Sequence, residues 1–442
     1  MEQGLNWNDC LAHVEATDVG MRRSNNQDSY AVLLASDADS WQRRGHVFLV
    51  ADGMGAHAAG ELASKMAADG IPHNYYKLRE ESSPDAIRKT IKQVNEEIHR
   101  RGQANAEFHG MGTTASVLVL VPQGALVAHV GDSRVYRLRG ARIEQLTFDH
   151  SLVWEMTASG QYNPSMPNLV PKNIITRSLG PHKNVQVDLE GPFPLEVGDT
   201  FLLCSDGLSG LVKDEEMGVI MGTLPPAEAA QVLIDLANLR GGPDNITVLI
   251  IRITGQAMTA RANSQAAPLA LADERAAQAA PPPSTAKFWW AAALCLAAAV
   301  GLAAIGSTLF NILAVAAVIL AVVLGTWAFL QRLAPEKPVN YLAPGARLGR
   351  APYRAWDCPP NDAIVRNLGL LIDQLREAAR DGKWSVDWTK FNAYSAQGKA
   401  AIDRRDYAQA VREYARALRF MMNELRNQNR RKPSDDSDVL TA

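Results

Sequence analysis

The sequence predicts an α+β fold for residues 10–254, with antiparallel sheets covered by helices. Short β-patterned runs such as TTASVLVLV, ALVAHV, RVYRLR and TFLLCS are bounded by turn-forming stretches such as VPQG, LRGAR and EVGD. Many of the runs lie only a turn apart, which indicates antiparallel pairing. Two helical stretches, residues 58–78 and 84–103, interrupt these runs. The second repeats apolar residues at spacings of three and four, at Ile87, Ile91, Val94 and Ile98. This spacing predicts an amphipathic helix that lies on a sheet.

Composition narrows the class of protein before any motif is considered. The chain has 442 residues, 47% of them hydrophobic, which is enough for a sizeable core in two or three domains. The four cysteines lie far apart with no C-x-x-C pair, an arrangement that argues against a zinc finger or a disulfide framework and favours a reducing compartment: Cys10, Cys204, Cys295 and Cys358. The start, MEQGLNWNDC, lacks the basic and apolar stretches of a secretory signal. Residues 331–442 are net basic but lack interleaved aromatic residues, so no nucleic-acid partner is expected.

An apolar segment follows an Ala/Pro-rich linker at residues 255–286. Phe288 to Leu330 contains no charged residue, and the polar break GSTLFN divides it into stretches of residues 288–306 and 312–330. Each stretch approaches the roughly 20 residues of a membrane span. The basic flanks predict two transmembrane helices within residues 287–332, and a multi-pass protein of the inner (cytoplasmic) membrane with both remaining regions in the cytoplasm. The alternative is a buried hairpin of a soluble domain.

The C-terminal part is predicted to be a small all-α region. A Pro/Gly-rich connector, residues 333–360, precedes a helical pattern over residues 361–428, and residues 429–442 read as a disordered tail. One stretch, GKAAIDRRDYAQAVREYARAL, is similar to a single tetratricopeptide repeat at its small and aromatic positions: Gly398, Ala410, Tyr414 and Ala417. A generic helical hairpin explains the pattern equally well, and either structure offers a docking surface for proteins.

Acidic residues recur where strands begin or end. Asp52 follows the apolar run at residues 46–51, Asp132 and Asp206 follow two further runs, and Asp244 precedes the last. A single Asp-Gly step is most often a turn, and the glycines after Asp52 fit neither the dinucleotide fingerprint nor the P-loop. Four such acids together favour a cluster that needs protons or a cation. Hard oxygen ligands with open water positions suit Mg²⁺ or Mn²⁺.

Seven blocks in order resemble the bacterial metal-dependent serine/threonine protein phosphatases of type 2C: TDVGMRRSNNQDSY, VADGMGAHAAGE, GMGTT, VGDSR, LTFDHS, LLCSDGL and GGPDNITV. The resemblance covers about residues 10–254, and the catalytic domain is expected to span residues 1–254. It implies a four-layer α-β-β-α sandwich of two antiparallel sheets flanked by helices, with a metal centre at one end. It also makes residues 159–180 the counterpart of that family's variable flap beside the active site.

The same resemblance assigns roles to individual residues. Asp52 is expected to bridge two ions, Mn²⁺ or Mg²⁺, with the Gly53 carbonyl on one and Asp206 and Asp244 on the other. Asp132 with Asp206 is expected to hold a weaker third ion. Arg23 matches the phosphate-binding arginine, whereas its neighbour Arg22 reads as a surface cation. His57 is expected to protonate the leaving serine or threonine oxygen, with a purely local hydrogen bond as the alternative.

The resulting hypothesis is a membrane-face enzyme that hydrolyses phosphoserine and phosphothreonine in proteins and opposes a serine/threonine kinase. Retention of the four aspartates and Arg23 favours catalysis over the rival hypothesis, a catalytically weak scaffold that binds phosphoproteins. Two departures from the family pattern stand out. Gln27 replaces a frequent glutamate next to the metals, which weakens the expected metal affinity, and Ala56 replaces a frequent glycine in the loop that carries His57.

Overall fold

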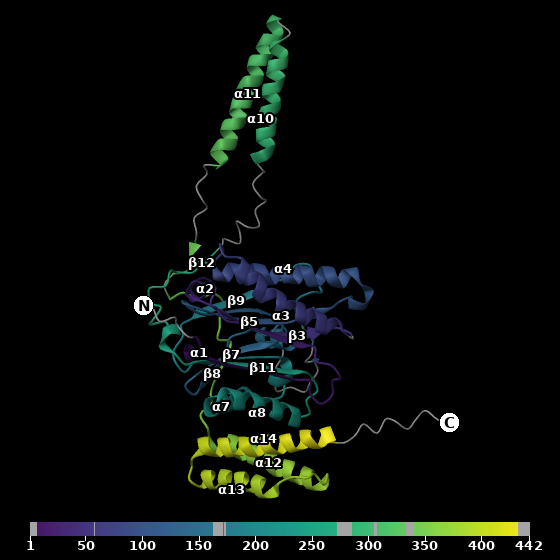
Figure 1. Ribbon diagram of the computed structural model, residues 1–442, viewed down its shortest axis with the longest axis vertical. Helices are drawn as coiled ribbons and strands as arrows, with labels where there is room; N and C mark the ends of the chain where they lie inside the picture. Colours follow the sequence, from purple (N-terminus) through teal and green to yellow (C-terminus); the bar gives the residue numbers. More distant parts are fainter. Residues whose placement is uncertain are drawn as a thin grey trace, which may run out of the picture. The chain divides into compact units, whose positions relative to one another are not determined.

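The computed structural model describes residues 7–56, 58–161, 171, 174–271, 285–304, 307–332, 340–343 and 345–431. The chain divides into two compact units. The larger unit combines Met1–Leu269 with Ala343–Ala442, and the smaller unit is Ala270–Leu342. The C-terminal region therefore belongs to the same unit as the predicted catalytic domain (Figure 1).

The first sheet of the larger unit contains strands in the order β2-β3-β5-β6-β9, with β4 paired to β3, and every pairing is antiparallel. The strands are β2 (Asp28–Leu33), β3 (His46–Met54), β4 (Gly112–Thr113), β5 (Ala115–Val121), β6 (Gly124–Val130) and β9 (Asp188–Phe193). The short helix α2 (Ala38–Arg43) precedes β3. Helices α3 (Ala59–Lys77) and α4 (Ser83–Ala104) cover this sheet (Figure 1), close to the two helical stretches expected from the sequence.

The second sheet has the order β1-β11-β10-β7-β8-β14 and is also antiparallel. Its strands are β1 (Leu11–Asp18), β7 (Arg134–Arg139), β8 (Arg142–Gln145), β10 (Thr200–Cys204), β11 (Ile246–Ile253) and β14 (Arg354–Asp357). The helices beside it are α1 (Trp7–Cys10), α5 (Leu152–Ala158), α6 (Asp206–Ser209), α7 (Asp214–Thr223) and α8 (Pro226–Leu239). Single-turn helices η1 (Ala106–Phe108) and η2 (Gln256–Met258) complete this part.

Alternation along the central strands builds two cores, one on each face of the second sheet. Phe201 and Leu203 of β10 pack between the two sheets with Phe48 of β3. Their neighbours Leu202 and Cys204 pack on the opposite face against α7 and α8. Successive side chains of a strand point to opposite faces, so a strand that is apolar at every position must be covered on both sides. The structure confirms the predicted sandwich of two antiparallel sheets between helices.

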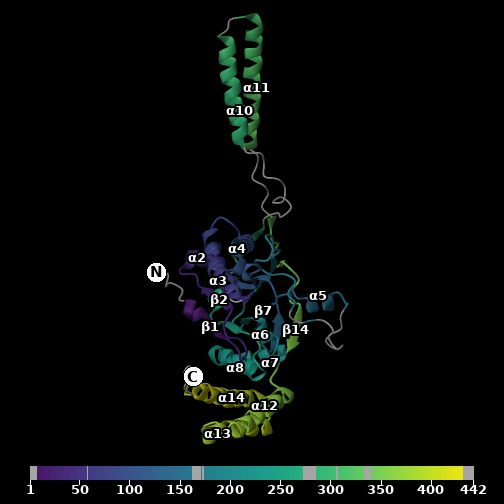
Figure 2. The same cartoon turned by 90° about the vertical axis from the view of Figure 1, so that its right-hand side faces the viewer.

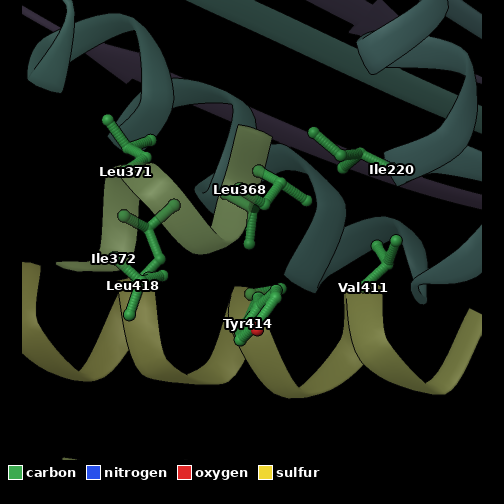
Figure 3. Close-up of a pocket in the computed structure, with 9 residues that line it drawn as sticks. Ile220, Leu368, Leu371, Ile372, Val411, Tyr414 and Leu418 are labelled. Atoms are coloured by element: carbon green, nitrogen blue, oxygen red, sulfur yellow. The ribbon is translucent and has the colours of Figure 1, made fainter. Parts of the chain in front are cut away.

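The C-terminal helices add a further helical layer to this sandwich. Helices α12 (Asp362–Asp381), α13 (Trp388–Asp403) and α14 (Tyr407–Arg431) share one apolar core with α7 and α8. Figure 3 shows how Leu368, Tyr414 and Val411 face Ile220 across this interface. The cavity left there is about 10 Å³, too small for more than one water molecule. The tail is therefore closely packed on the domain whose sequence it follows.

Within the tail, a contact between two of the repeat-like positions holds α13 against α14. A side chain at Gly398 would lie 2.4 Å from the Tyr414 ring, so only glycine lets the two helices approach this closely. Ala410 and Ala417 are fully buried beside it. These contacts fit a tetratricopeptide repeat and a generic helical hairpin alike.

The smaller unit holds the charge-free segment. It contains helices α10 (Thr285–Ala303) and α11 (Thr308–Arg332), and the short strands β12 (Ala270–Leu271) and β13 (Asn340–Tyr341) pair with each other. Among the described residues, no helix is long and apolar enough to cross a membrane. The prediction of a transmembrane hairpin and of a multi-pass membrane location is therefore wrong for the chain described here.

Two predicted segments differ from or extend beyond the described chain. The connector expected at residues 333–360 contains β14, which pairs with β8 in the register Trp356↔Ile143. The tail expected to be disordered from residue 429 lies outside the described residues from residue 432 onward, and α14 itself runs to Arg431.

One ion pair anchors α14 on α8 and gives a test of this packing. The Arg426 guanidinium donates to Asp235 Oδ1 at 2.5 Å, and Asp235 is 1% exposed. Arg426→Ala should lower the free energy of unfolding at pH 8 by about 1–3 kcal/mol, because it leaves a buried carboxylate without its charged partner. Burial raises the pKa of Asp235 to about 6 despite the nearby arginines.

The same variant carries a pH signature. A carboxyl group whose pKa is raised on folding takes up a proton in the folded state as the pH falls, so the loss of Arg426 should matter less at pH 5 than at pH 8. Denaturant unfolding at both pH values measures the difference. The control Arg366→Ala removes an exposed pair with Asp362 and should cost at most about 0.5 kcal/mol. Equal losses for the two variants would contradict the anchoring role of Arg426.

Candidate active site

The acidic loop after β3 is shaped by a close approach between two backbone segments. A side chain at Gly53 would lie 2.2 Å from the Gly60 carbonyl oxygen and 2.5 Å from that of Gln27. Only glycine allows the start of α3 and the residue just before β2 to pack this closely on the end of β3. This packing explains Gly53 of the DGMG stretch, but it does not explain why the residue before it is an acid.

Hydroxyl groups fix the backbone around Asp52. The Asp52 N–H donates to Thr114 Oγ1 at 2.9 Å, and Thr113 Oγ1 donates to the Asp52 carbonyl at 2.9 Å. Thr114 Oγ1 also lies 2.8 Å from Ser133 Oγ, in the turn that carries Asp132. The GMGTT block therefore fixes Asp52 through its main chain, and these hydrogen bonds do not use the Asp52 carboxylate.

The structure brings together the four predicted aspartates and a fifth acid. Asp28 of β2 stands opposite Asp52 of β3 in the strand register. Asp52 lies close enough to four other carboxyl groups for each to raise its pKa: Asp28, Asp206, Asp132 and Asp244. All of them lie at strand ends or in the turns that follow. Acids from both sheets thus gather at one end of the sandwich.

Burial and mutual repulsion disfavour the charged forms of these acids. Burial is the largest cause in each case, and the neighbouring carboxylates add to it. The pKa of Asp28 rises to about 7, that of Asp132 rises to about 8, and that of Asp52 rises well above its ordinary value. The pKa of Asp206 is also raised, although a hydrogen bond with Asp52 opposes the shift. Such a cluster stores repulsion that protons or cations would relieve.

Several carboxylate oxygens of the cluster have no hydrogen-bond partner among the described residues, and such oxygens can bind a cation. Asp28 Oδ1, Asp132 Oδ1 and Asp206 Oδ1 are buried without a hydrogen-bond partner among the described residues. Across the same residues, no three acidic, histidine or cysteine side chains are arranged to hold one ion together. Mg²⁺ commonly binds through one or two carboxylates and keeps several waters. The donor set therefore fits hydrated hard cations rather than a site enclosed by protein ligands.

Arg23 lies at the edge of the acidic cluster. Its Nη2 donates to Asp244 Oδ2 at 2.7 Å, and its side chain is half exposed. Asn245 fixes this edge, because its Nδ2 donates to the Val19 and Asn25 carbonyls on the loop that bears Arg23. Arg22 is exposed. His57 lies outside the described residues, so its position relative to the cluster stays a prediction.

Sequence reasoning missed three polar residues that complete the cluster. Asp28 accepts a hydrogen bond from Ser205 Oγ at 2.7 Å, and Ser205 Oγ in turn accepts the Thr247 N–H. Asn245 Oδ1 accepts the Gln27 N–H at 2.8 Å. Asp28 also fits the pattern of an acid at the beginning or end of a strand, because it stands at the start of a strand in NNQDSY. Nothing local in the sequence marks Ser205 or Asn245, because their partners are distant in the chain.

Two helix-covered antiparallel sheets with an acidic centre at one end define an α-β-β-α sandwich, and sequence comparison identifies the family within this class. The sequence model of the protein phosphatase 2C family matches residues 21–237. Protein phosphatase PhpP of Streptococcus pneumoniae is 38% identical over 241 residues, 53% of this chain and 94% of the relative. The serine/threonine phosphatase stp of Listeria monocytogenes is 39% identical over 53% of this chain and 93% of its own length. The chain belongs to the protein phosphatase 2C family and is a protein serine/threonine phosphatase.

Solved structures include similar proteins. The Mycobacterium tuberculosis serine/threonine phosphatase PstP/Ppp is 32% identical, with a TM-score of 0.48, over 56% of this chain and 100% of that one. The three tail helices lie outside the region that the family model matches, which ends at residue 237.

Repulsion in the cluster predicts an unusual effect on stability. With a chelator present, Asp52→Asn should raise the free energy of unfolding at pH 8 by about 1–3 kcal/mol, because it removes one buried like charge. Folded-state pKa values above the ordinary range mean that stability is lost as the pH rises through them. Because a free carboxyl group titrates near pH 4, the unsubstituted protein should lose stability from about pH 4 up to about pH 7 to 8, the folded-state pKa values of Asp28 and Asp132, and the variant should lose less.

Denaturant unfolding from pH 4 to pH 9 measures this effect. Asp39→Asn is the control, since Asp39 is an exposed partner of Arg43 on α2. A lower stability for Asp52→Asn than for the control would show that Asp52 supports the fold, contrary to the prediction.

Proposed function

We propose that this phosphatase hydrolyses phosphoserine and phosphothreonine in proteins by attack of an activated water, with the help of two divalent cations, Mn²⁺ or Mg²⁺, and a weaker third. Family membership supplies the reaction class. The observation that carries the cation proposal is the set of buried carboxylate oxygens without partners at Asp28, Asp132 and Asp206. Buried polar atoms are normally satisfied, so unpaired acidic oxygens in one cluster favour a positively charged ligand.

The proposed ligands are those expected from the family resemblance. Asp52 and the Gly53 carbonyl would serve one ion, Asp52, Asp206 and Asp244 a second, and Asp132 with Asp206 a third. When bound, such cations supply a water that is ionised near neutral pH and stabilise charge on the phosphate oxygens. Gln27 contributes no charge beside them, so the affinity for the ions is expected to be lower than with a glutamate.

Arg23 is proposed to bind the substrate phosphate. Its guanidinium is half exposed at the edge of the cluster and donates a hydrogen bond to Asp244. A guanidinium has five N–H donors in a planar fork that matches two phosphate oxygens. Exchange of Asp244 for phosphate would leave the carboxylate for a cation, so substrate binding and ion binding favour each other.

His57 is proposed to act as general acid. Its position five residues after Asp52 supports this role only through the sequence. A serine or threonine alkoxide is a poor leaving group, and an imidazolium close to it can supply the proton that it needs.

The proposed partners are phosphorylated proteins and a serine/threonine kinase whose products they are. In this proposal residues 1–254 catalyse the reaction and residues 361–428 bind partner proteins. Contacts between α14 and α8 use one face of the tail inside the molecule, so docking would use the outer helix α13. A rival function, a scaffold that binds phosphoproteins without turning them over, predicts phosphopeptide binding without phosphate release.

Loss of a cluster acid should separate catalysis from folding. Asp52→Asn and Asp244→Asn should each reduce cation-dependent phosphate release from a phosphothreonine peptide by at least about 10³-fold, since each removes a proposed ligand. Asp132→Asn should be milder. Phosphate release by the full chain with Mn²⁺, and again with a chelator, measures this, with Asp39→Asn as the control. Near-normal release by Asp52→Asn would refute the proposed two-cation chemistry, and release by no form of the protein would favour the scaffold.

The leaving group tests His57. His57→Ala should slow hydrolysis of a phosphoserine peptide roughly 10²- to 10⁴-fold, the usual contribution of a general acid. Hydrolysis of p-nitrophenyl phosphate should slow far less, because nitrophenolate leaves without a proton. Initial rates on both substrates decide the question, and equal losses would assign His57 a structural role.

A further inference from the structure

The loop that carries Arg23, residues 19–27, joins β1 to β2 and is here called the arginine loop. The loop rests on the turn between α8 and β11, because the Met21 N–H donates to the Gly242 carbonyl at 2.8 Å. This turn follows directly from α8, which ends at Leu239. The end of α8 therefore contributes to the position of Arg23 beside the acidic cluster.

Asp18, the last residue of β1, fastens the start of the arginine loop to α8. Its Oδ1 accepts a hydrogen bond from the Gly20 N–H at 2.9 Å and another from Asn238 Nδ2 at 3.1 Å. Asn238 lies in the last turn of α8 and is 6% exposed. A side chain at Gly20 would lie 2.2 Å from the Asp244 carbonyl oxygen, so the loop backbone touches the residue whose carboxylate pairs with Arg23. A shift of Asp18 would therefore move the loop against the cluster.

The tail holds the same face of α8 through Arg426. Figures 1 and 2 both show α14 beside α8, and the Arg426 guanidinium donates to Asp235 Oδ1 at 2.5 Å. Asp235 precedes Asn238 by three residues, and residues at this spacing lie on one face of a helix. The contact that secures α14 and the contact that secures Asp18 are therefore neighbours on α8.

The two contacts are also linked by charge. Burial is the main cause of the raised pKa of Asp235, and the nearby Asp18 carboxylate adds to it, whereas Arg426 and Arg419 oppose it. Asp18 and Arg426 also line one groove of about 430 Å³ between β1, α8 and α14. The guanidinium of Arg426 therefore compensates two carboxylates, the buried one that it binds and the one that holds the arginine loop.

We propose that Arg426 is a positioning residue of this phosphatase: from the tail, it acts through Asp235 and Asn238 of α8 to hold the arginine loop against the acidic cluster. The consequence for substrate binding rests on the proposed function, in which Arg23 binds the phosphate. The family model matches only as far as residue 237, and α14 lies beyond it. The 241 residues matched to the streptococcal phosphatase already make up 94% of that protein, which leaves too few residues for a counterpart of the tail helices. Positioning of this loop by a tail helix is thus a property that the family match does not supply.

Removal of the guanidinium should loosen the arginine loop. In Arg426→Ala, the buried charge of Asp235 is left beside Asp18, and repulsion between the two carboxylates weakens the hydrogen bond from Asn238 to Asp18. Arg426→Lys restores a positive charge and should recover at least about half of the effect. Val411→Ala is the matched control, because it removes packing of α14 on α7 and leaves the charge pair in place.

Limited proteolysis of the full-length variants reports the state of the loop without any turnover. Arg22 and Arg23 are exposed, so trypsin can cleave after them when the loop detaches. At pH 8, Arg426→Ala should raise the initial rate of cleavage at these two sites by roughly three- to tenfold, the range of a single coupled contact. Val411→Ala should raise this rate by less than about twofold. Equal rises in the two variants would overturn the proposal, since general loosening of the tail would explain both.

A double-mutant cycle with Asn238 tests the route through α8. Asn238→Ala removes the donor to Asp18 and should itself raise the cleavage rate by roughly three- to tenfold. If Arg426 acts through this bond, Arg426→Ala should add less than about a twofold rise in the Asn238→Ala background, because the effects of coupled residues do not add. Independent effects in the double variant would overturn the proposed route. If Arg426→Ala does not fold, Arg426→Gln replaces it, and unchanged cleavage in that variant would overturn the proposal.

Steady-state kinetics with Mn²⁺ connect the loop to the reaction. Arg426→Ala should raise the KM for p-nitrophenyl phosphate and for a phosphothreonine peptide by the same factor, roughly three- to tenfold, because both substrates carry the phosphate that Arg23 is proposed to bind. The kcat should change by less than about twofold. Faster cleavage with an unchanged KM would support the link to the loop and contradict the proposed role of Arg23. Unchanged cleavage would overturn the link whether or not the protein releases phosphate, so failure of this proposal is distinct from failure of the proposed function.

Discussion

Asp28, Asp52, Asp132 and Asp206 repel one another where the two sheets end, and burial disfavours the charged form of each. A folded chain tolerates such a cluster only if the remaining contacts over-determine the positions of its members. Here the required rigidity comes from strand register, which sets Asp28 opposite Asp52, and from threonine hydroxyls that bind the backbone rather than the carboxylates. The apolar cores on both faces of the second sheet supply the compensating stability.

The distance along the chain between interacting residues explains which parts of the structure could be predicted from the sequence. Strand ends, glycine turns and amphipathic helices depend on residues a few positions apart, so the sandwich and the four aspartates could be predicted. Asp28 obeys the same local rule and was within reach. Ser205, Asn245 and Arg426 act on residues far away in the chain, for instance Asp235 beneath Arg426, and no spacing in one sequence encodes such contacts.

Composition alone misled at two places. The uncharged residues at 288–330 suggested membrane spans. A lack of charge, however, does not distinguish a segment that lies in lipid from one that packs against protein. The Pro/Gly-rich connector suggested a loop, yet four of its residues form β14 because an open sheet edge at β8 accepts hydrogen bonds from any extended backbone. Backbone pairing of this kind depends little on side chains, so composition could not reveal it.

The tail helices pack on α7 and α8, so the catalytic region and the tail form one structural unit. Asp235 of α8 lies buried beneath Arg426, and Ile220 of α7 faces Leu368 and Val411. In this chain the tail helices cover this apolar face of the matched region. The segments outside the family match are therefore joined to the chemistry through the second sheet: one of its faces packs against the helical layers, and its end carries Asp132, Asp206 and Asp244.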